Sequence, residues 1–312
     1  CGKPPPFQMC ITPVYQDDTR VANFPPGFVD DLSTRDVHFS SVRGDRHRVV
    51  EPEWCIGHRF FNTKQTAHIS IFRRTRVITD KTSVGEHMKL GIHAGPQDLS
   101  MQDLKRLWAK GDENGFHWIS VWDHFYANPL SDRRNPCFEG VAAMAGLAAS
   151  THNVRVGCLV FCALFRNPGV LAKAGVTIDH LSDGRADVGI GAGWFEEEFR
   201  EFGYGFPPLG KRLDQLEEAL TIIRALWNGE EVDFKGEFYQ MQGAICSPRP
   251  IGLRLWVGGR GKVRTVDIAA RFADGFNMPY VDPDTAADRL QRLRMACDRH
   301  DRDYDAIDNS VN

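Results

Sequence analysis

An aspartate and a histidine stand side by side directly after an apolar run, residues 116–122, and they are the first candidates for chemistry. Asp123 and His124 follow that run without a gap. Histidine changes its charge near neutral pH, so a carboxylate beside it could orient the imidazole to handle protons at a cofactor or substrate. The alternative is structural, with Asp123 capping a loop and His124 packing. Their position alone leaves both interpretations open.

A glycine-rich segment, Gly189 to Trp194, follows another apolar run. Gly191 and Gly193 would let a ligand approach the backbone closely, and Trp194 could stack on that ligand or cover it. A GxGxG sequence without the pattern of a dinucleotide-binding fold after it is not a dinucleotide fingerprint. This segment is therefore a predicted binding surface without a specified ligand.

A second glycine-rich segment lies just before a predicted helix. Gly258, Gly259, Arg260 and Gly261 precede Lys262, so that small residues, two cations and a helix N-terminus come together. This combination favours an anion, and late strands of α/β barrels are the usual place for a phosphate. We predict a phosphate site here.

Cysteine and histidine usage argues against a metal centre. The eight cysteines are scattered without a CxxC pair, so they indicate neither a zinc site nor a disulfide framework. Cys162 and Ala163 lie in an apolar run that ends in Arg166, which we interpret mainly as a buried strand with Cys162 as a small hydrophobic residue. A metal-dependent hydrolase would need converging ligands, and His93 has no HxH partner.

The elements that must position these residues alternate regularly from Met88 onward. Predicted strands cover residues 89–93, 116–122, 154–165, 186–190, 253–257 and 276–280, and predicted helices cover residues 100–113, 141–149, 168–182, 211–227, 263–272 and 285–300. A hairpin is expected over residues 231–242. Strands that alternate with helices imply a parallel sheet, and this many units favour a closed (β/α)8 TIM-type barrel.

The two ends of the chain depart from this pattern. Residues 1–87 show little periodicity, and we expect a non-barrel extension, disordered or non-native, whose removal leaves the stability unchanged. Residues 88–312 are the expected barrel domain, a little short of the roughly 250 residues typical of such barrels. About six strand–helix units are present and residues 309–312 look like a seventh strand cut off, so we expect an incomplete barrel, truncated at the C-terminus.

Charge and hydropathy exclude some partners. The net charge is −3 and the pI is near 6.4, which gives no basic field for nucleic acid or an anionic membrane. No stretch approaches the roughly 20 apolar residues that span a bilayer. We therefore expect a cytoplasmic protein that binds a small-molecule substrate, and we consider a homodimer as its assembly without a residue that decides it.

Several motifs occur together in the second half of the chain: Leu181–Arg185, Gly189–Trp194, Glu196–Phe199, Arg212–Asp214, Glu217–Leu220 and Pro248–Pro250. Together they resemble the luciferase-like monooxygenase superfamily, and most of all its F420-dependent (deazaflavin) oxidoreductase branch. The resemblance runs from Met88 to the end of the chain, and residues 1–87 have no counterpart in it.

The resemblance implies roles for the predicted site residues. His124, with Asp123, would lie beside the redox ring. The segment around Cys162 and Ala163 would match the third-strand bulge, which in relatives can hold a non-prolyl cis peptide that backs the ring. The loop from Gly258 to Gly261 would hold the cofactor phosphate.

Two departures from the family pattern matter. The segment from Pro250 to Leu255 is shorter than in relatives. Strands missing at the C-terminus would also complete the cofactor site, so an incomplete barrel could be inactive.

The implied cofactor is F420, with FMN as the alternative. A deazaflavin passes hydride and does not activate oxygen, whereas FMN can support monooxygenation; in both cases the protein positions and desolvates the ring. We therefore expect hydride transfer between F420 and a small organic substrate. An FMN-dependent luciferase-like monooxygenase and a non-catalytic flavin-binding barrel remain the alternatives.

Overall fold

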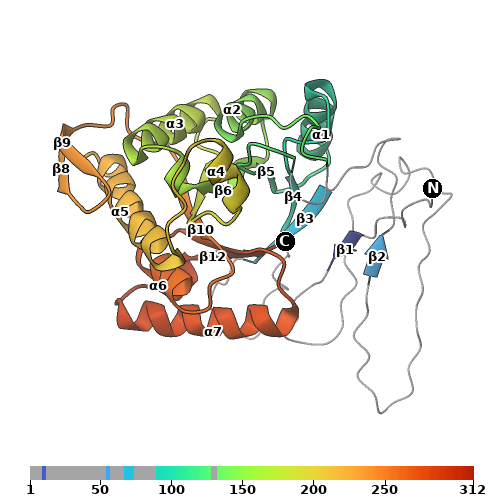
Figure 1. Ribbon diagram of the computed structural model, residues 1–312. Helices are drawn as coiled ribbons and strands as arrows, with labels where there is room; N and C mark the ends of the chain where they lie inside the picture. The colour runs from blue at the N-terminus through green and yellow to red at the C-terminus, as the bar shows by residue number, and fades with distance from the viewer. Residues whose placement is uncertain (1–8, 12–53, 57–66, 74–88, 128–131) are drawn as a thin grey trace, which may run out of the picture.

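Eight strands form a closed barrel in the computed structural model, which describes residues 9–11, 54–56, 67–73, 89–127 and 132–312. Their order around the barrel is β10-β11-β12-β3-β4-β5-β6-β7, and helices surround them (Figure 1). The strands are β3 (Ala67–Arg73), β4 (Lys89–Ala94), β5 (Trp118–Val121), β6 (Arg155–Cys162), β7 (Ala186–Gly191), β10 (Arg254–Gly258), β11 (Gly275–Met278) and β12 (Asp308–Val311).

The helices begin and end close to where the sequence predicts, except α4, which the sequence analysis did not predict. They are α1 (Met101–Glu113), α2 (Gly140–Ser150), α3 (Pro168–Leu181), α4 (Glu196–Glu201), α5 (Leu209–Trp227), α6 (Arg264–Phe272) and α7 (Pro283–Arg299), with 3-10 turns η1 (Ala163–Phe165) and η2 (Tyr304–Ala306). The side chain of Ser100 accepts the backbone N–H of Asp103, which confirms the predicted cap of α1. Gly115 and Gly184 follow α1 and α3 with φ of 75° and 83°, as expected for left-handed helix stops.

The predicted parallel α/β architecture is confirmed. All barrel strands except β3 pair in parallel with one another, and a helix follows each of them up to β11. β12 pairs with β11, so residues 308–311 are the seventh parallel strand that the sequence predicts. The hairpin of β8 (Val232–Lys235) and β9 (Gln240–Ala244) also lies where it is expected, between α5 and β10.

One strand corrects the expected boundary of the barrel. Ala67–Arg73 belongs to the segment that we expected outside the barrel, yet it pairs antiparallel with β12 on one side and β4 on the other. β4 and β12 would otherwise be edge strands with unpaired N–H and C=O groups, and β3 satisfies both. No helix follows this strand, so it lacks the strand–helix alternation by which the other strands were predicted. β1 (Met9–Ile11) and β2 (Trp54–Ile56) form a separate antiparallel pair.

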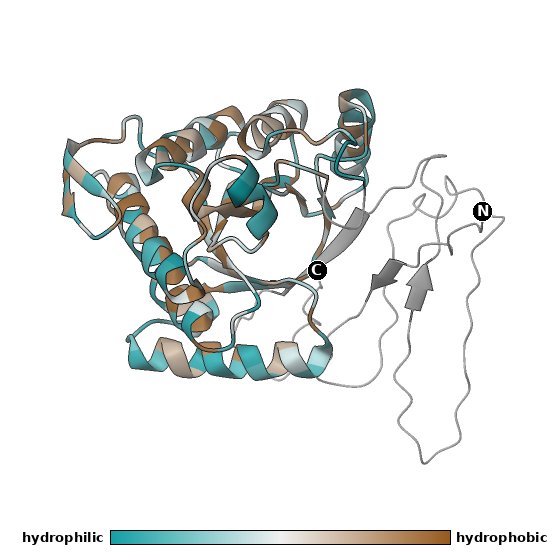
Figure 2. Ribbon diagram, in the orientation of Figure 1, coloured by the Kyte–Doolittle hydropathy of each residue, from teal (hydrophilic) through white to brown (hydrophobic). Residues whose placement is uncertain are grey.

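The main core lies between the barrel and its helices. Outward-facing strand residues such as Ile119, Val188, Leu255 and Phe276 are fully buried there. The apolar sides of the helices face the barrel, while their outer sides are hydrophilic, most clearly on α7 (Figure 2). This packing fixes each strand end relative to the next.

The amino-terminal half of the barrel interior is filled. Arg155, Asp187, Arg254 and Asp308 form a network of ion pairs at the strand starts, with Arg155 Nε 2.8 Å from Asp187 Oδ2 and Arg254 Nη2 2.7 Å from Asp308 Oδ2. Above it the indoles of Trp118 and Trp256 stack at 5.1 Å. A ligand must therefore bind at the carboxyl ends of the strands, as is usual in such barrels.

Candidate functional site

His124 is held at the carboxyl end of β5 by a buried carboxylate from another element. Its Nδ1 lies 2.8 Å from Oε2 of Glu198 on α4, and the Glu198 side chain is 1% exposed. Oε1 of Glu198 accepts the backbone N–H groups of Phe125 at 2.7 Å and Tyr126 at 3.1 Å. A carboxylate only accepts hydrogen bonds, so Nδ1 carries the hydrogen and Nε2 is the nitrogen available to a ligand.

Trp194 lies beside this imidazole. Its ring is 5.6 Å from that of His124, nearly perpendicular to it, and it stacks on Phe195 at 5.3 Å. The indole is 60% exposed, so it forms part of the rim of the site rather than of the core. The structure therefore brings together His124 and Trp194, two of the predicted site residues.

Asp123 points to a different partner from the one that the sequence suggests. It does not pair with His124: its carboxylate accepts the N–H of Cys162 at 2.9 Å and both ends of the Arg166 guanidinium at 2.6 and 2.7 Å. Arg166 also pairs with Glu139. Burial lowers the pKa of Arg166, but its hydrogen bonds and the charges of Asp123 and Glu139 outweigh this and hold it above its ordinary value. Asp123 thus ties β5 to the junction of β6 and α3.

The bulge of β6 lies earlier than the resemblance implies. The register shifts between Cys158 and Phe161, and the non-prolyl cis peptide joins Leu159 to Val160, ahead of Cys162 and Ala163. Cys162 is buried, and this burial raises the pKa of its thiol to about 12.

Ala163 follows Cys162 and is also buried. Its carbonyl accepts the hydroxyl of Tyr239 at 3.2 Å, which ties the end of β6 to the β8–β9 hairpin.

Glycines form the floor of the site above the stacked indoles. A Cβ on Gly191 would lie 2.7 Å from Val160 Cγ2 and 3.0 Å from the carbonyl oxygen of Gly258. A Cβ on Gly258 would lie 2.5 Å from Val160 Cγ1. The Asn277 side chain also lies near, with its Oδ1 3.5 Å from the Cβ position of Gly258, so backbone, Val160 and Asn277 form this low floor.

Gly193 has a positive φ of 73°, which favours glycine. A Cβ there would lie 2.7 Å from the Phe199 ring and 2.8 Å from the Cys162 sulfur. The turn after β7 is thereby packed against α4, which carries Glu198. Gly193 acts on the site through the position of that helix.

The loop after β10 matches the predicted anion cradle in composition and position. Gly259, exposed Arg260 and Gly261 precede α6, whose N-cap residue Val263 makes no side-chain hydrogen bond. A Cβ on Gly261 would lie 2.2 Å from Thr265 Oγ1, so this turn lies against the first turn of α6. The N–H groups at this helix end have no side-chain cap, which suits an anion.

Two residues of the site have no counterpart among the sequence predictions. Glu198 lies in a run of three glutamates, and nothing in the sequence distinguishes it from its neighbours. Arg289 is buried and donates from Nη2 to the carbonyl of Arg260 at 2.8 Å. The sequence does contain a signal for Arg289, because this cation occurs at helical spacing from Ala286 and Leu293, two buried residues of α7.

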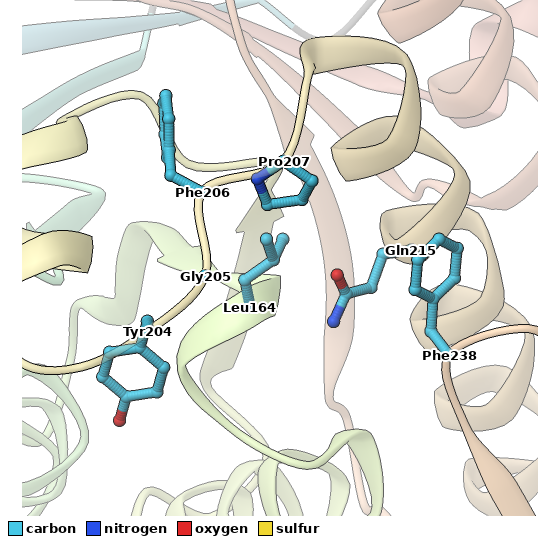
Figure 3. Close-up of a pocket in the computed structure, with 7 residues that line it drawn as sticks. All are labelled: Leu164, Tyr204, Gly205, Phe206, Pro207, Gln215 and Phe238. Carbon is cyan, nitrogen blue, oxygen red and sulfur yellow. The ribbon is translucent and has the colours of Figure 1, made fainter.

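A separate cavity of about 550 Å³ opens beside the barrel mouth and contains none of the predicted site residues. Figure 3 shows Leu164 and Pro207 between Tyr204 on one side and Gln215 with Phe238 on the other. Its lining is mainly aromatic and aliphatic, from the end of η1, the loop before α5, α5 itself and the β8–β9 hairpin.

Two kinds of feature are not found in the part of the chain that the structure describes. No group of three His, Cys, Asp or Glu side chains there could hold a metal ion. None of its helices combines the length and apolar character needed to cross a bilayer.

Comparisons with known proteins agree with this geometry. An F420-dependent glucose-6-phosphate dehydrogenase of Gordonia bronchialis is 30% identical over 241 residues, which cover 73% of this chain and 68% of the relative. The enzyme of that name from Rhodococcus hoagii is 31% identical over 195 residues, which cover 61% of this chain and 56% of the relative. The chain thus spans between about half and two thirds of the length of these relatives.

A solved structure shows the same fold. An F420-dependent secondary alcohol dehydrogenase in complex with an F420–acetone adduct superimposes with a TM-score of 0.64 at 23% identity, over 70% of this chain and 66% of that one. A model of the luciferase-like monooxygenase family matches residues 83–312. The predicted family is confirmed: the chain belongs to the luciferase-like monooxygenase family.

Proposed function

We propose that this protein is an F420-dependent oxidoreductase that transfers hydride between the deazaflavin and a small organic substrate, within a domain that comprises residues 88–312 and β3. The observation that carries the proposal is the imidazole of His124, fixed by Glu198 at 2.8 Å with Nε2 available, at the carboxyl end of the barrel. The names of the relatives from Gordonia bronchialis and Rhodococcus hoagii favour F420 over FMN.

The residues present fit such a cofactor. The floor at Gly191 and Gly258 has no room for a Cβ, so a flat ring would meet backbone and the side chains of Val160 and Asn277 there. The loop of Gly259, Arg260 and Gly261 lies at a helix N-terminus and would take the phosphate. When bound, a deazaflavin supplies a hydride donor or acceptor that does not activate oxygen.

The protein's own groups would then do three things. The glycine floor and loop bind and orient the cofactor, and Trp194 shields one side of His124 from water. His124 Nε2 gives or takes the proton that accompanies hydride transfer at a carbonyl or alcohol oxygen of the substrate. Glu198 keeps the ring orientation and stabilises the imidazolium form.

Binding and turnover with each cofactor test the proposal. Purified protein is titrated with F420 and with FMN, and F420 reduction is followed with alcohols and with glucose 6-phosphate as donors. We expect tighter binding of F420 and donor-dependent F420 reduction. Tight FMN binding with oxygen consumption would instead support the monooxygenase alternative, and F420 binding without turnover by any donor would support a non-catalytic barrel.

A further inference from the structure

We infer that Arg289 of α7 binds the phosphate of a phosphorylated ligand at the loop between β10 and α6; the inference rests on the proposed function only for which ligand carries that phosphate. The sequence motifs do not include this residue, although its spacing with Ala286 and Leu293 places it on the buried side of α7. Arg289 lies on α7, which packs beside α6 (Figure 1). The glycine loop precedes α6, so the two parts of the site come from different strand–helix units.

Arg289 is a buried cation with donors to spare. It is 4% exposed, and its Nε and Nη1 atoms are buried without a hydrogen-bond partner. Only Nη2 is satisfied, by the carbonyl oxygen of Arg260 at 2.8 Å. Buried charges in proteins are almost always paired and hydrogen-bonded, because an unpaired one loses its hydration without compensation. This guanidinium therefore calls for an anion.

The neighbouring charges do not supply that anion. The carboxylate of Asp282 caps α7 through Thr285, whose N–H and hydroxyl bind it at 2.8 and 2.7 Å. The carboxylate of Asp288 pairs with Arg292 at 2.8 Å. Burial lowers the pKa of Arg289 and the positive charge of Arg260 lowers it further, while Asp288 and Asp282 raise it from a distance. The local field is positive on the side of the loop.

The position of Arg289 points to an oxyanion between α7 and the glycine loop. Its Nη2 contacts the loop at the Arg260 carbonyl, so the guanidinium that carries the two unpartnered nitrogens lies against the loop. The loop adds the helix end of α6 and the second cation, Arg260. A guanidinium fork beside helix N–H groups suits the several oxygens of a phosphate. Arg289 thus completes a site that the glycine loop alone only begins.

The first test measures the binding of inorganic phosphate to the full chain by titration calorimetry, and the unfolding temperature with and without phosphate. We expect Arg289→Met to weaken phosphate binding by at least about tenfold, because charge-assisted hydrogen bonds are lost. Without phosphate, the same variant should unfold at the temperature of the parent protein or above it, because a buried unpaired charge has been removed. This pair of opposite effects distinguishes an anion ligand from a structural arginine.

Matched variants make the result specific. Arg292→Met removes an exposed cation three residues further along α7 and should leave phosphate binding within about twofold, because surface charges are screened. Arg289→Gln keeps a donor for the Arg260 carbonyl without the charge, so it should fold and still lose phosphate binding. Unchanged phosphate affinity in both Arg289 variants, or a much lower melting temperature in both without phosphate, would overturn the proposal.

The source of the phosphate is found by comparing ligands with and without it. FMN is compared with riboflavin and glucose 6-phosphate with glucose, alongside F420, in the parent protein and in Arg289→Met. A loss of affinity for F420 and FMN but not riboflavin identifies the cofactor phosphate, and a loss for glucose 6-phosphate alone identifies the substrate. Absence of F420-dependent turnover would reject the proposed function and leave the phosphate titration as an independent result.

Discussion

At the scale of single residues, the site depends on side chains that distant elements fix in place. His124 follows β5, yet its orientation is set by Glu198 on α4, 74 residues later. Glu198 is saturated by the imidazole and by the N–H groups of Phe125 and Tyr126, so it can neither rotate nor leave without stranding three donors. The arrangement resembles the base–orienter pairs of other acid–base sites.

Replacing His124 by alanine should reduce turnover far more than cofactor binding. Loss of a positioned acid–base group typically lowers the rate by about 10²–10⁴-fold, whereas contacts to the phosphate and the ring provide most of the affinity. Single-turnover F420 reduction, cofactor titration and melting temperature are measured on the same sample. A near-normal rate per folded molecule would remove His124 from the chemistry.

Replacing Glu198 should affect stability as well as rate. Glu198→Ala strands buried donors, so we expect the free energy of unfolding to fall by about 1–3 kcal/mol or more. Glu198→Gln keeps an oxygen for the N–H groups of Phe125 and Tyr126 and should be less destabilised, while still lowering the rate. Chemical denaturation compares the two variants. Equal stability of Glu198→Ala and the parent protein would contradict this role.

The sequence predicted His124 and Trp194 as site residues, but it did not predict which side chains hold the site residues in place. His124 and Trp194 stand directly after apolar strands, so position and residue type identified them. Glu198 is the last of three consecutive glutamates, and only the folded chain shows which of them turns inward. Asp123 was assigned a partner next to it in sequence, whereas its ion pair with Arg166 forms across two strand ends. Short-range patterns do not reveal such long-range pairs.

At the scale of elements, buried carboxylates hold helices and loops together at both ends of the barrel. Asp123 and Arg166 join the end of β5 to the start of α3, and their side chains are 1% and 14% exposed. Asp112 at the end of α1 accepts the N–H groups of His152, Asn153 and Val154. In both cases one carboxylate joins two separate segments of the chain by accepting several hydrogen bonds from the second segment.

Removing Arg166 should therefore cost stability. Breaking one side of a buried ion pair destabilises proteins by about 3–5 kcal/mol, because the remaining charge is left without a partner. We expect Arg166→Met to fall in this range in denaturant unfolding. The control is Arg106→Met, whose pair with Asp103 is exposed and worth about 1 kcal/mol or less. A similar small effect for both would show that the Asp123 junction is held by other contacts.

The stability provided by Asp112 should depend on pH. Burial raises the pKa of Asp112, but the N–H groups of Val154, His152 and Asn153 outweigh it and place the pKa below its ordinary value. A carboxyl with a depressed folded pKa stabilises the fold above its unfolded pKa of about 3.9 and loses this contribution as pH falls through the folded value. Asp112→Asn should therefore be least stable relative to the parent near pH 7. A stability difference that stays constant down to pH 3 would contradict this.

At the scale of the whole molecule, the alternation of strands and helices was enough to predict the parallel barrel. Most of the parallel strands are buried and read as apolar runs, and helices such as α1, α3 and α7 have N-caps that the sequence shows. β3 gives no such signal because it belongs to no strand–helix unit and lies within an irregular segment. Its place follows from the edges of β4 and β12, which are a property of the assembled barrel rather than of any segment.

Deleting β3 should accordingly destabilise the barrel, contrary to the expectation from the sequence that residues 1–87 are dispensable. Removing residues 1–66 leaves β3 in place, whereas removing residues 1–74 exposes the backbone edges of β4 and β12. Lost backbone hydrogen bonds of about 0.5–1.5 kcal/mol each should lower the stability by about 2 kcal/mol or more. In a domain of this size that loss corresponds to a melting temperature lower by about 4–8 °C.

The chain without residues 1–74 should also self-associate, since free strand edges pair with other chains. Calorimetry and light scattering compare the two deletions directly. If both variants melt at the same temperature and stay equally monodisperse, β3 contributes nothing and the barrel is stable with its edges open.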